Sequence, residues 1–316
     1  MVDLQKIWGV RLKNIVTAVS TSDDGQYTIA ASKDRHVYMF DAKGQAFWTK
    51  KFEMAPSGVA MAPNGSFAVL TVNYDIFCYD LQGNIKWNQK AGGETKRCAI
   101  TPDGKKIAVS CGDCHLYLYN ESGVVLWRYK AEGQAVALAV NRDASVNVVG
   151  STNGDMHILD GLGGLIKRRD FAFDVLCCAI SGSGKVLLIG SYNKLVVIRL
   201  DKGTEDTFEV ENWVRDVAMD QAPSNILVGS MGVVSFFDGD FAPVYNLSPT
   251  GWAHAIKITQ DGRFVTVGYG DDHVDLYENR DYKRSRKADP NFKVTEDQWE
   301  DIVQRVAELE KALGKK

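Results

Sequence analysis

The sequence has few cysteines, no long apolar run and no excess of charge of one sign. Six cysteines in 316 residues are too few for a disulfide scaffold, so we expect thiols that pack as small apolar side chains. The longest apolar runs, such as residues 186–190 and 195–198, are far shorter than the ~18 residues of a membrane span. The 37 Lys and Arg against 40 Asp and Glu give a net charge of −3, which excludes a general attraction for nucleic acid or anionic lipid.

The first residues also lack a basic segment followed by an apolar stretch and a small-residue cleavage site, so we expect a soluble, cytoplasmic protein. The composition is otherwise that of a globular chain. With 45% hydrophobic and 24% charged residues, the chain can bury a large core. Disordered and collagen-like chains are therefore excluded.

A turn signal recurs along the chain about every 40 residues, with steps of 40, 39, 40, 40, 41 and 37 residues between the markers Gly25, Gly65, Gly104, Ala144, Gly184, Asn225 and Gly262. A small and apolar strand precedes each marker, and two further β-prone runs separated by a polar turn follow it. Three strands with tight turns in about 40 residues indicate one blade of a β-propeller that lacks its fourth strand.

An Asp/Asn-x-x-Gly-x-x-x-Trp pattern supplies the fourth strand in three units, ending at Trp48, Trp87 and Trp127. Each of these tryptophans precedes the next marker by 17 residues, and Trp8 precedes Gly25 by the same 17. The seventh unit has no such segment after Tyr277. We therefore predict an all-β, seven-bladed propeller over residues 1–282, with the strand around Trp8 completing the last blade so that no sheet edge stays open.

These units resemble WD-repeat propellers, and their Asp-x-x-Gly-x-x-x-Trp segments resemble the PQQ-like repeats of quinoprotein-type propellers. The resemblance covers residues 5 to 282 and is strongest in the first three units. Two features depart from it, because the Gly-His and Trp-Asp dipeptides of WD repeats are absent and units four to seven lack the tryptophan. The resemblance implies a propeller fold.

Two cysteine motifs indicate redox or metal chemistry when they are read alone. Cys111-Gly-Asp-Cys114-His115 matches the attachment pattern of c-type haem and could also contribute to a zinc site. However, His115 lies 11 residues after its marker, as His36 and His273 do after theirs. We therefore interpret the Asp-x-His unit as a repeated turn in which Asp bonds the local backbone.

The second motif is the Cys177-Cys178 pair. The quinoprotein resemblance implies a vicinal disulfide that covers the cofactor. Cys178 precedes its marker by six residues, and the positions with this spacing in the other units are all apolar: Val19, Val59, Cys98, Leu138, Met219 and Ile256. We therefore expect a core position on the innermost strand, and we assign no catalytic residue, cofactor or metal.

Aromatic side chains concentrate beside the loops that join blades in units five to seven, namely Phe171, Phe173, Trp213 and Trp252. Exposed Trp and Phe often anchor protein interfaces, whereas buried ones would pack between blades. Polar neighbours such as Arg215 and His254 favour an exposed position for the two tryptophans. We predict that these four residues contact a partner.

The end of the chain has a different character. Residues 283–294 are predicted as a basic linker and residues 295–316 as an amphipathic helix that begins with a capping box at Thr295. Its apolar stripe is spaced 3, 4, 3 and 4 residues, over Trp299, Ile302, Val306, Leu309 and Leu313. The helix could pack on its own propeller, form a coiled coil or enter another subunit, and the linker favours a contact between molecules.

Together these features predict a non-catalytic scaffold or adaptor subunit of a larger cytoplasmic assembly. One propeller face would bind a protein partner, and the C-terminal helix would anchor or oligomerise the protein. The alternative is a quinone- or metal-dependent redox enzyme that uses the channel. Its functional residues would come from Cys111, Cys114, His115, Cys177 and Cys178. No sequence feature marks a small-ligand site in the channel, and no motif identifies the partner.

Overall fold

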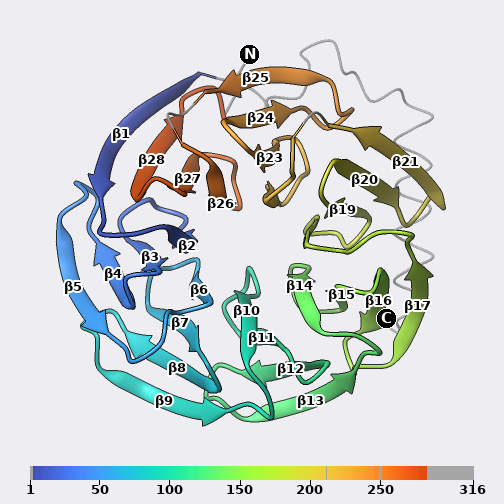
Figure 1. Ribbon diagram of the computed structural model, residues 1–316, viewed down its shortest axis with the longest axis horizontal. Helices are drawn as coiled ribbons and strands as arrows, with labels where there is room; N and C mark the ends of the chain where they lie inside the picture. The colour runs from blue at the N-terminus through green and yellow to red at the C-terminus, as the bar shows by residue number, and fades with distance from the viewer. Residues whose placement is uncertain (1–2, 211, 249–250, 283–316) are drawn as a thin grey trace, which may run out of the picture. The chain divides into compact units, whose positions relative to one another are not determined.

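The computed structural model describes residues 3–210, 212–248 and 251–282. In these residues 28 β-strands form seven four-stranded antiparallel sheets, which are arranged as blades around a central channel (Figure 1). The fold is therefore the predicted all-β, seven-bladed propeller. The predicted linker 283–294 and helix 295–316, with Trp299, Ile302, Val306, Leu309 and Leu313, lie outside the described residues. No helix in the described ranges has the length and apolar character needed to cross a membrane.

The first three blades each use four consecutive strands, from the innermost to the outermost. Blade 1 contains β2 (Val16–Thr21), β3 (Thr28–Ser32), β4 (His36–Phe40) and β5 (Ala46–Lys51). Blade 2 contains β6 (Gly58–Met61), β7 (Phe67–Val72), β8 (Asp75–Asp80) and β9 (Ile85–Lys90). Blade 3 contains β10 (Thr95–Ile100), β11 (Lys106–Cys111), β12 (His115–Asn120) and β13 (Val125–Lys130).

Blades 4 to 6 follow the same order. Blade 4 contains β14 (Ala135–Val140), β15 (Val146–Ser151), β16 (Asp155–Asp160) and β17 (Leu165–Asp170). Blade 5 contains β18 (Cys177–Ile180), β19 (Val186–Gly190), β20 (Lys194–Arg199) and β21 (Thr204–Glu209). Blade 6 contains β22 (Asp216–Met219), β23 (Ile226–Ser230), β24 (Val233–Phe237) and β25 (Pro243–Leu247).

Blade 7 combines the two ends of the propeller sequence. Its strands are β26 (Ala253–Ile258), β27 (Phe264–Tyr269), β28 (His273–Asn279) and β1 (Leu4–Arg11), in that order from the channel outwards. Trp8 lies opposite Leu276, and Figure 1 shows β1 beside β28 at the rim. The predicted closure by the N-terminal strand is thus confirmed, and it leaves no blade with three strands.

The strand pairing corrects one detail of the predicted repeat. Met219 pairs with Ile226 in blade 6 as Ile180 pairs with Leu187 in blade 5. The residue that corresponds to the marker Gly184 is therefore Pro223, not Asn225, and Val217 rather than Met219 corresponds to Cys178. Blade 6 has proline rather than glycine here, and in its turn the Asp220 carboxylate accepts the Ser224 N–H at 2.8 Å.

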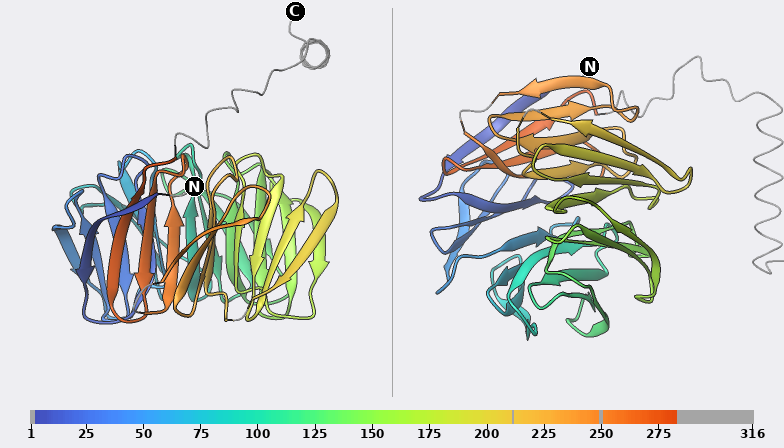
Figure 2. Two further views of the ribbon diagram at one scale, coloured as in Figure 1. Left: turned by 90° about the horizontal axis from the view of Figure 1, so that it is seen from above. Right: turned by 45° about the vertical axis from the view of Figure 1, so that its right-hand side comes forward.

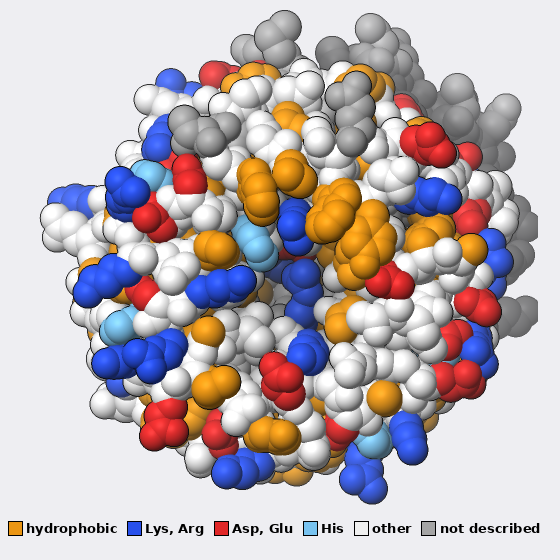
Figure 3. Space-filling model, in the orientation of Figure 1, with side chains coloured by type: hydrophobic (Ala, Val, Ile, Leu, Met, Phe, Trp, Pro, Cys, Tyr) orange, Lys and Arg blue, Asp and Glu red, His pale blue; other side chains and the backbone are white. Residues whose placement is uncertain are grey.

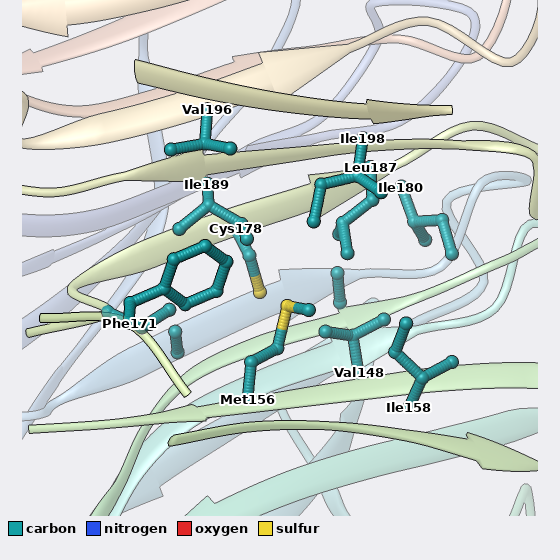
Figure 4. Packing of buried hydrophobic residues seen from close by; sticks show 13 residues of the cluster. Val148, Met156, Ile158, Phe171, Cys178, Ile180, Leu187, Ile189, Val196 and Ile198 are labelled. Atoms are coloured by element: carbon teal, nitrogen blue, oxygen red, sulfur yellow. The ribbon is translucent and has the colours of Figure 1, made fainter. Parts of the chain in front are cut away.

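Burial is greatest in the second strands and least in the outermost strands. All residues of β3 and β7 are buried, whereas all residues of the rim strands β17 and β21 are exposed. The core lies between neighbouring blades: Val148, Met156 and Ile158 of blade 4 face Cys178, Ile180, Leu187, Ile189, Val196 and Ile198 of blade 5 (Figure 4). Such burial of apolar surface between sheets stabilises the ring.

The four tryptophans of the predicted pattern link neighbouring blades. Each indole lies against the turn glycine of the next blade, in the pairs Trp8–Gly44, Trp48–Gly83, Trp87–Gly123 and Trp127–Gly163. Three of the indoles also donate a hydrogen bond across the same junction, from Trp48 to the Leu81 carbonyl, from Trp87 to that of Glu121 and from Trp127 to that of Gly161. The sequence pattern therefore reflects contacts between blades as well as within them.

The strands stand roughly along the ring axis, so the loops gather on two opposite faces (Figure 2). Because successive strands are antiparallel, the loops between blades and those between second and third strands share one face, which we call the joining face. The remaining turns form the turn face.

Candidate functional site in the central channel

The innermost strands surround a cavity of about 200 Å³. Its wall contains one apolar side chain from each blade at the position of Cys178: Val19, Val59, Cys98, Leu138, Cys178, Val217 and Ile256. The expected apolar environment of Cys178 on the innermost strand is thus confirmed, with Val217 in place of Met219. These side chains pack mainly between the blades, and polar groups make up much of the surface that faces the cavity.

Three charged residues interrupt two rings of small side chains on the same strands. Arg97 and Asp216 occupy a level at which the other blades carry Ala18, Gly58, Ala137, Cys177 and Ala255. Lys257 occupies a level at which the other blades carry Ser20, Ala60, Ala99, Ala139, Ala179 and Ala218, all lining the cavity. Sequence reasoning missed these three residues, although a charged residue at a position that is small in every other unit was the available signal.

Arg97 and Asp216 form an ion pair that joins blades 3 and 6 across the channel. Arg97 Nη1 lies 3.3 Å from Asp216 Oδ1, and Asp216 Oδ2 accepts the Ile256 N–H of blade 7 at 3.0 Å. Burial disfavours the charged guanidinium, but the attraction of Asp216 outweighs it and raises the pKa of Arg97. The guanidinium of Arg97 is therefore held in the charged form.

Lys257 has no comparable partner. In the described ranges no carboxylate oxygen lies within 4 Å of its ammonium nitrogen. Burial in the channel lowers the pKa of Lys257, and the negative charges of Asp216 and Asp23 oppose that effect. The cavity thus holds a lysine whose charge is only partly compensated by protein groups.

A belt of hydrogen bonds lines the turn face of the channel. It runs through one residue in the first turn of each blade: Asp23, Pro63, Pro102, Arg142, Gly182, Gln221 and Gln260. Four backbone N–H groups donate to the carbonyl of the next blade, from Arg142 to Gly182 (3.3 Å), Gly182 to Gln221 (3.0 Å), Gln221 to Gln260 (3.1 Å) and Asp23 to Pro63 (2.8 Å). Between blades 7 and 1, the Gln260 N–H donates to Asp23 Oδ1 at 3.1 Å.

The belt is interrupted where proline removes the donor. Pro63 and Pro102 have no N–H, so neither can donate to the next blade. The side chain of Gln260 crosses the channel instead, and its Nε2 donates to the Pro102 carbonyl at 3.0 Å. A side chain therefore spans this end of the channel.

The joining face has an aromatic rim at the channel mouth. Trp213 and Trp252 are 47% and 48% exposed, and the guanidinium of Arg215 lies over both rings, 5.1 and 5.8 Å from their centroids. Tyr192, which donates its hydroxyl to Asp174 at 3.0 Å, meets Trp213 edge-on at 5.3 Å. Figure 3 shows hydrophobic side chains at one side of the central opening and cationic side chains within it. We call Tyr192, Trp213, Arg215 and Trp252 the aromatic rim.

The two predicted phenylalanine contacts lie elsewhere. Phe171 is 7% exposed and belongs to the core between blades 4 and 5, and Phe173 packs against the same core with its ring 5.1 Å from that of Phe171. These two residues pack between blades, which was the alternative to a partner contact. The segment after β17 turns inward over the junction between blades 4 and 5. The structure leaves Trp213 and Trp252 as the predicted contacts with large exposed rings.

The cysteine motifs show the geometry of the repeat. The His115 N–H donates to Asp113 Oδ1 at 3.1 Å, as the His36 N–H does to Asp34 Oδ1 at 2.9 Å, which confirms the repeated Asp-x-His turn. Burial raises the pKa of the Cys111 and Cys178 thiols to about 12. The six cysteines are free, and no group of three or more His, Cys, Asp or Glu in the described ranges is placed to hold a metal ion.

Taken together, the repeats, the ring and the channel define a seven-bladed propeller of the WD and PQQ-like class. A family model described as outer membrane protein assembly factor BamB matches residues 33–225, more than half of the chain. The chain belongs to that family. A second model, described as WD domain, G-beta repeat, matches residues 10–41. No curated protein matches the chain.

Proposed function

We propose that this protein is a non-catalytic scaffold whose aromatic rim binds a protein partner. The observation that carries the proposal is the exposure of Trp213 and Trp252 on either side of Arg215. Tryptophan and arginine dominate the binding energy of many protein interfaces. The rings are already held by Arg215 and by Tyr192, so binding would immobilise few side chains.

The chemistry of the aromatic rim favours a partner segment that combines an apolar and an acidic side chain. Two half-exposed indole rings offer apolar area, and Arg215 supplies the positive charge between them. The Arg215 Nε is buried and has no hydrogen-bond partner among the described residues. A carboxylate on the partner would provide an acceptor for this guanidinium.

The test compares partner recovery by the full-length protein and by the double variant Trp213→Ala, Trp252→Ala. Phe47→Ala is the matched control, because Phe47 is 52% exposed on the rim strand β5, away from the channel. A partner that binds the wild type and the control but is lost from the double variant supports the proposal. Equal recovery of every partner by the double variant would refute it.

The proposed role of residues 283–316 is to anchor or oligomerise the scaffold within a larger assembly. The apolar stripe from Trp299 to Leu313 needs a surface to cover it, since a lone helix of this length is marginal in water. Removal of residues 283–316 should reduce the number of chains in the assembly in solution, or release a bound partner. Unchanged mass and unchanged partner recovery would contradict the anchoring role.

The proposal includes a cytoplasmic location and no enzymatic activity. The raised pKa of the buried Cys111 and Cys178 thiols supports the absence of cysteine-based redox or metal chemistry, which requires the thiolate. The competing redox enzyme would carry a bound chromophore or metal. Absorbance spectra and metal analysis of the purified protein distinguish the two, and cell fractionation tests the location.

A further inference from the structure

We propose that the central cavity is a binding site for a small organic carboxylate, held by Arg97 and Lys257. This site is distinct from the aromatic rim and does not depend on partner binding. The inference rests on three observations: the uncompensated charge in the cavity, the accessibility of its cations and the size and lining of the space.

Two cations, Arg97 and Lys257, and two carboxylates, Asp216 and Asp23, face the cavity. Asp216 is already engaged by Arg97 and by the Ile256 N–H, and Asp23 lies at the turn face, where it accepts the Gln260 N–H. Burial raises the pKa of Asp23 to about 6, so this carboxyl is still mostly ionised at neutral pH. Arg215 adds a third cation at the mouth. Among the residues that line the cavity, cations and carboxylates are equal in number, and Lys257 is the cation with no carboxylate oxygen within 4 Å in the described ranges.

Both cations can accept a further anion. The side chain of Arg97 is 37% exposed, and only one of its five N–H donors is used in the bond to Asp216 within the part of the chain that the structure describes. Lys257 lines the cavity, and its solvent-exposed surface faces the open space of the channel. An incoming carboxylate would replace the water that these groups lose by burial and would pair the lysine charge.

The repeat shows that the lysine is not required to fill space. Six blades place Ala or Ser at its level, and only blade 7 places a long cation there. Burying a cation without a partner is unfavourable, so the fold alone gives no reason for Lys257. A bound anion gives one.

The cavity also limits the size and shape of the ligand. An engineered apolar cavity of 150 Å³ holds one benzene ring, so about 200 Å³ accommodates roughly six to ten non-hydrogen atoms. The lining combines polar groups with small Ala and Ser side chains, so the carboxylate is the ligand feature that the cavity would recognise. The Gln260 side chain crosses the channel at the turn face, so the ligand enters from the joining face.

The experiment uses calorimetric titration of the full-length protein with benzoate and with succinate, and with the neutral amides benzamide and succinamide as matched probes. We expect at least one carboxylate to bind saturably with a Kd below about 1 mM, and its amide to bind at least about tenfold more weakly. Failure of both carboxylates to bind, or equal binding of acid and amide, would overturn the proposal.

Two variants locate the site. Lys257→Met should weaken carboxylate binding about tenfold and still fold, because six blades tolerate a small side chain at this level. Lys167→Met is the control, since it removes the same charge from the exposed rim strand β17. Equal binding by the two variants would show that the anion binds elsewhere and would refute the proposal. The double variant Trp213→Ala, Trp252→Ala should retain carboxylate binding, so that failure of this site and failure of the partner site remain distinguishable.

Discussion

The indole of Trp127 covers Gly163, so that a Cβ at this glycine would lie 2.9 Å from the ring atom Cδ2. Gly163 also has a φ of +83°, a left-handed conformation that disfavours other residues. Two separate constraints thus require glycine at the turn of blade 4. The same pair of constraints acts at Gly44, Gly83 and Gly123, and it explains why glycine and tryptophan recur together in the sequence.

Gly163→Ala should destabilise the protein more than Gly232→Ala. Gly232 has a φ of +84° but nothing within 4 Å of an added Cβ, so its substitution costs only the backbone strain of about 1–2 kcal/mol. At Gly163 the added methyl group must also displace the Trp127 ring, which adds about 1–3 kcal/mol. Denaturant unfolding of both variants measures the difference, and equal losses would show that the indole contact contributes nothing.

The Asp23 carboxyl should make stability depend on pH. Burial raises its pKa from 3.8 to about 6, the Gln260 N–H opposes this, and Asp261 adds to it. The native state therefore binds an additional proton between about pH 4 and 6, so stability falls as the pH rises through this range and the loss is complete above it.

Asp23→Asn keeps an oxygen acceptor for the Gln260 N–H and removes the charge. The variant should be more stable than the wild type at pH 7.5, by at most about 3 kcal/mol, and nearly equal to it at pH 4. Unfolding curves at the two values measure this. The exposed Asp240→Asn serves as control, and a variant that is less stable than the wild type at pH 7.5 would contradict the expectation.

The ion pair across the channel should appear as an energetic coupling between Arg97 and Asp216. Arg97→Met leaves the Asp216 carboxylate, which is only 8% exposed, without its cation. In the Asp216→Asn background the same substitution should cost about 1–2 kcal/mol less. A double-mutant cycle by thermal or denaturant unfolding measures the coupling, and strictly additive losses would mean that the pair does not bind blades 3 and 6 together.

Removal of residues 1–11 should convert the closed ring into one with an open edge on β28. The variant loses the pairing of Trp8 with Leu276 and the cover of Gly44. Unpaired strand edges promote association between chains. Light scattering should therefore show association or aggregation, and the melting temperature should fall. A monomeric variant as stable as the wild type would mean that β1 does not contribute to closure.

The sequence predicted the ring because its repeat is enforced by local chemistry. Turn residues, alternating β-prone runs and the Gly–Trp spacing each depend on contacts within or between adjacent blades, and these recur at a fixed interval. The one error in phase, at Asn225, arose in the turn of blade 6, where proline stands at the position of the marker glycine. Periodicity alone does not reveal such a substitution.

The channel site was less accessible to sequence reasoning. Arg97, Asp216 and Lys257 are far apart in the chain, and only ring closure brings them to one cavity. Polar neighbours favoured exposure of Trp213 and Trp252, whereas nothing in the sequence decided between exposure and burial for Phe171 and Phe173. Their burial depends on how the segment after β17 turns, which no local pattern specifies.

The partnership of β1 with β28 also constrains the order of events during synthesis. The first strand to leave the ribosome has to wait for almost the whole propeller before its partner exists. Until then it is an unsatisfied edge in a chain whose other blades can already form from neighbouring segments. Ring closure therefore cannot precede the synthesis of β28, and nascent chains that stall before residue 273 would leave the edges of β1 and β27 unpaired.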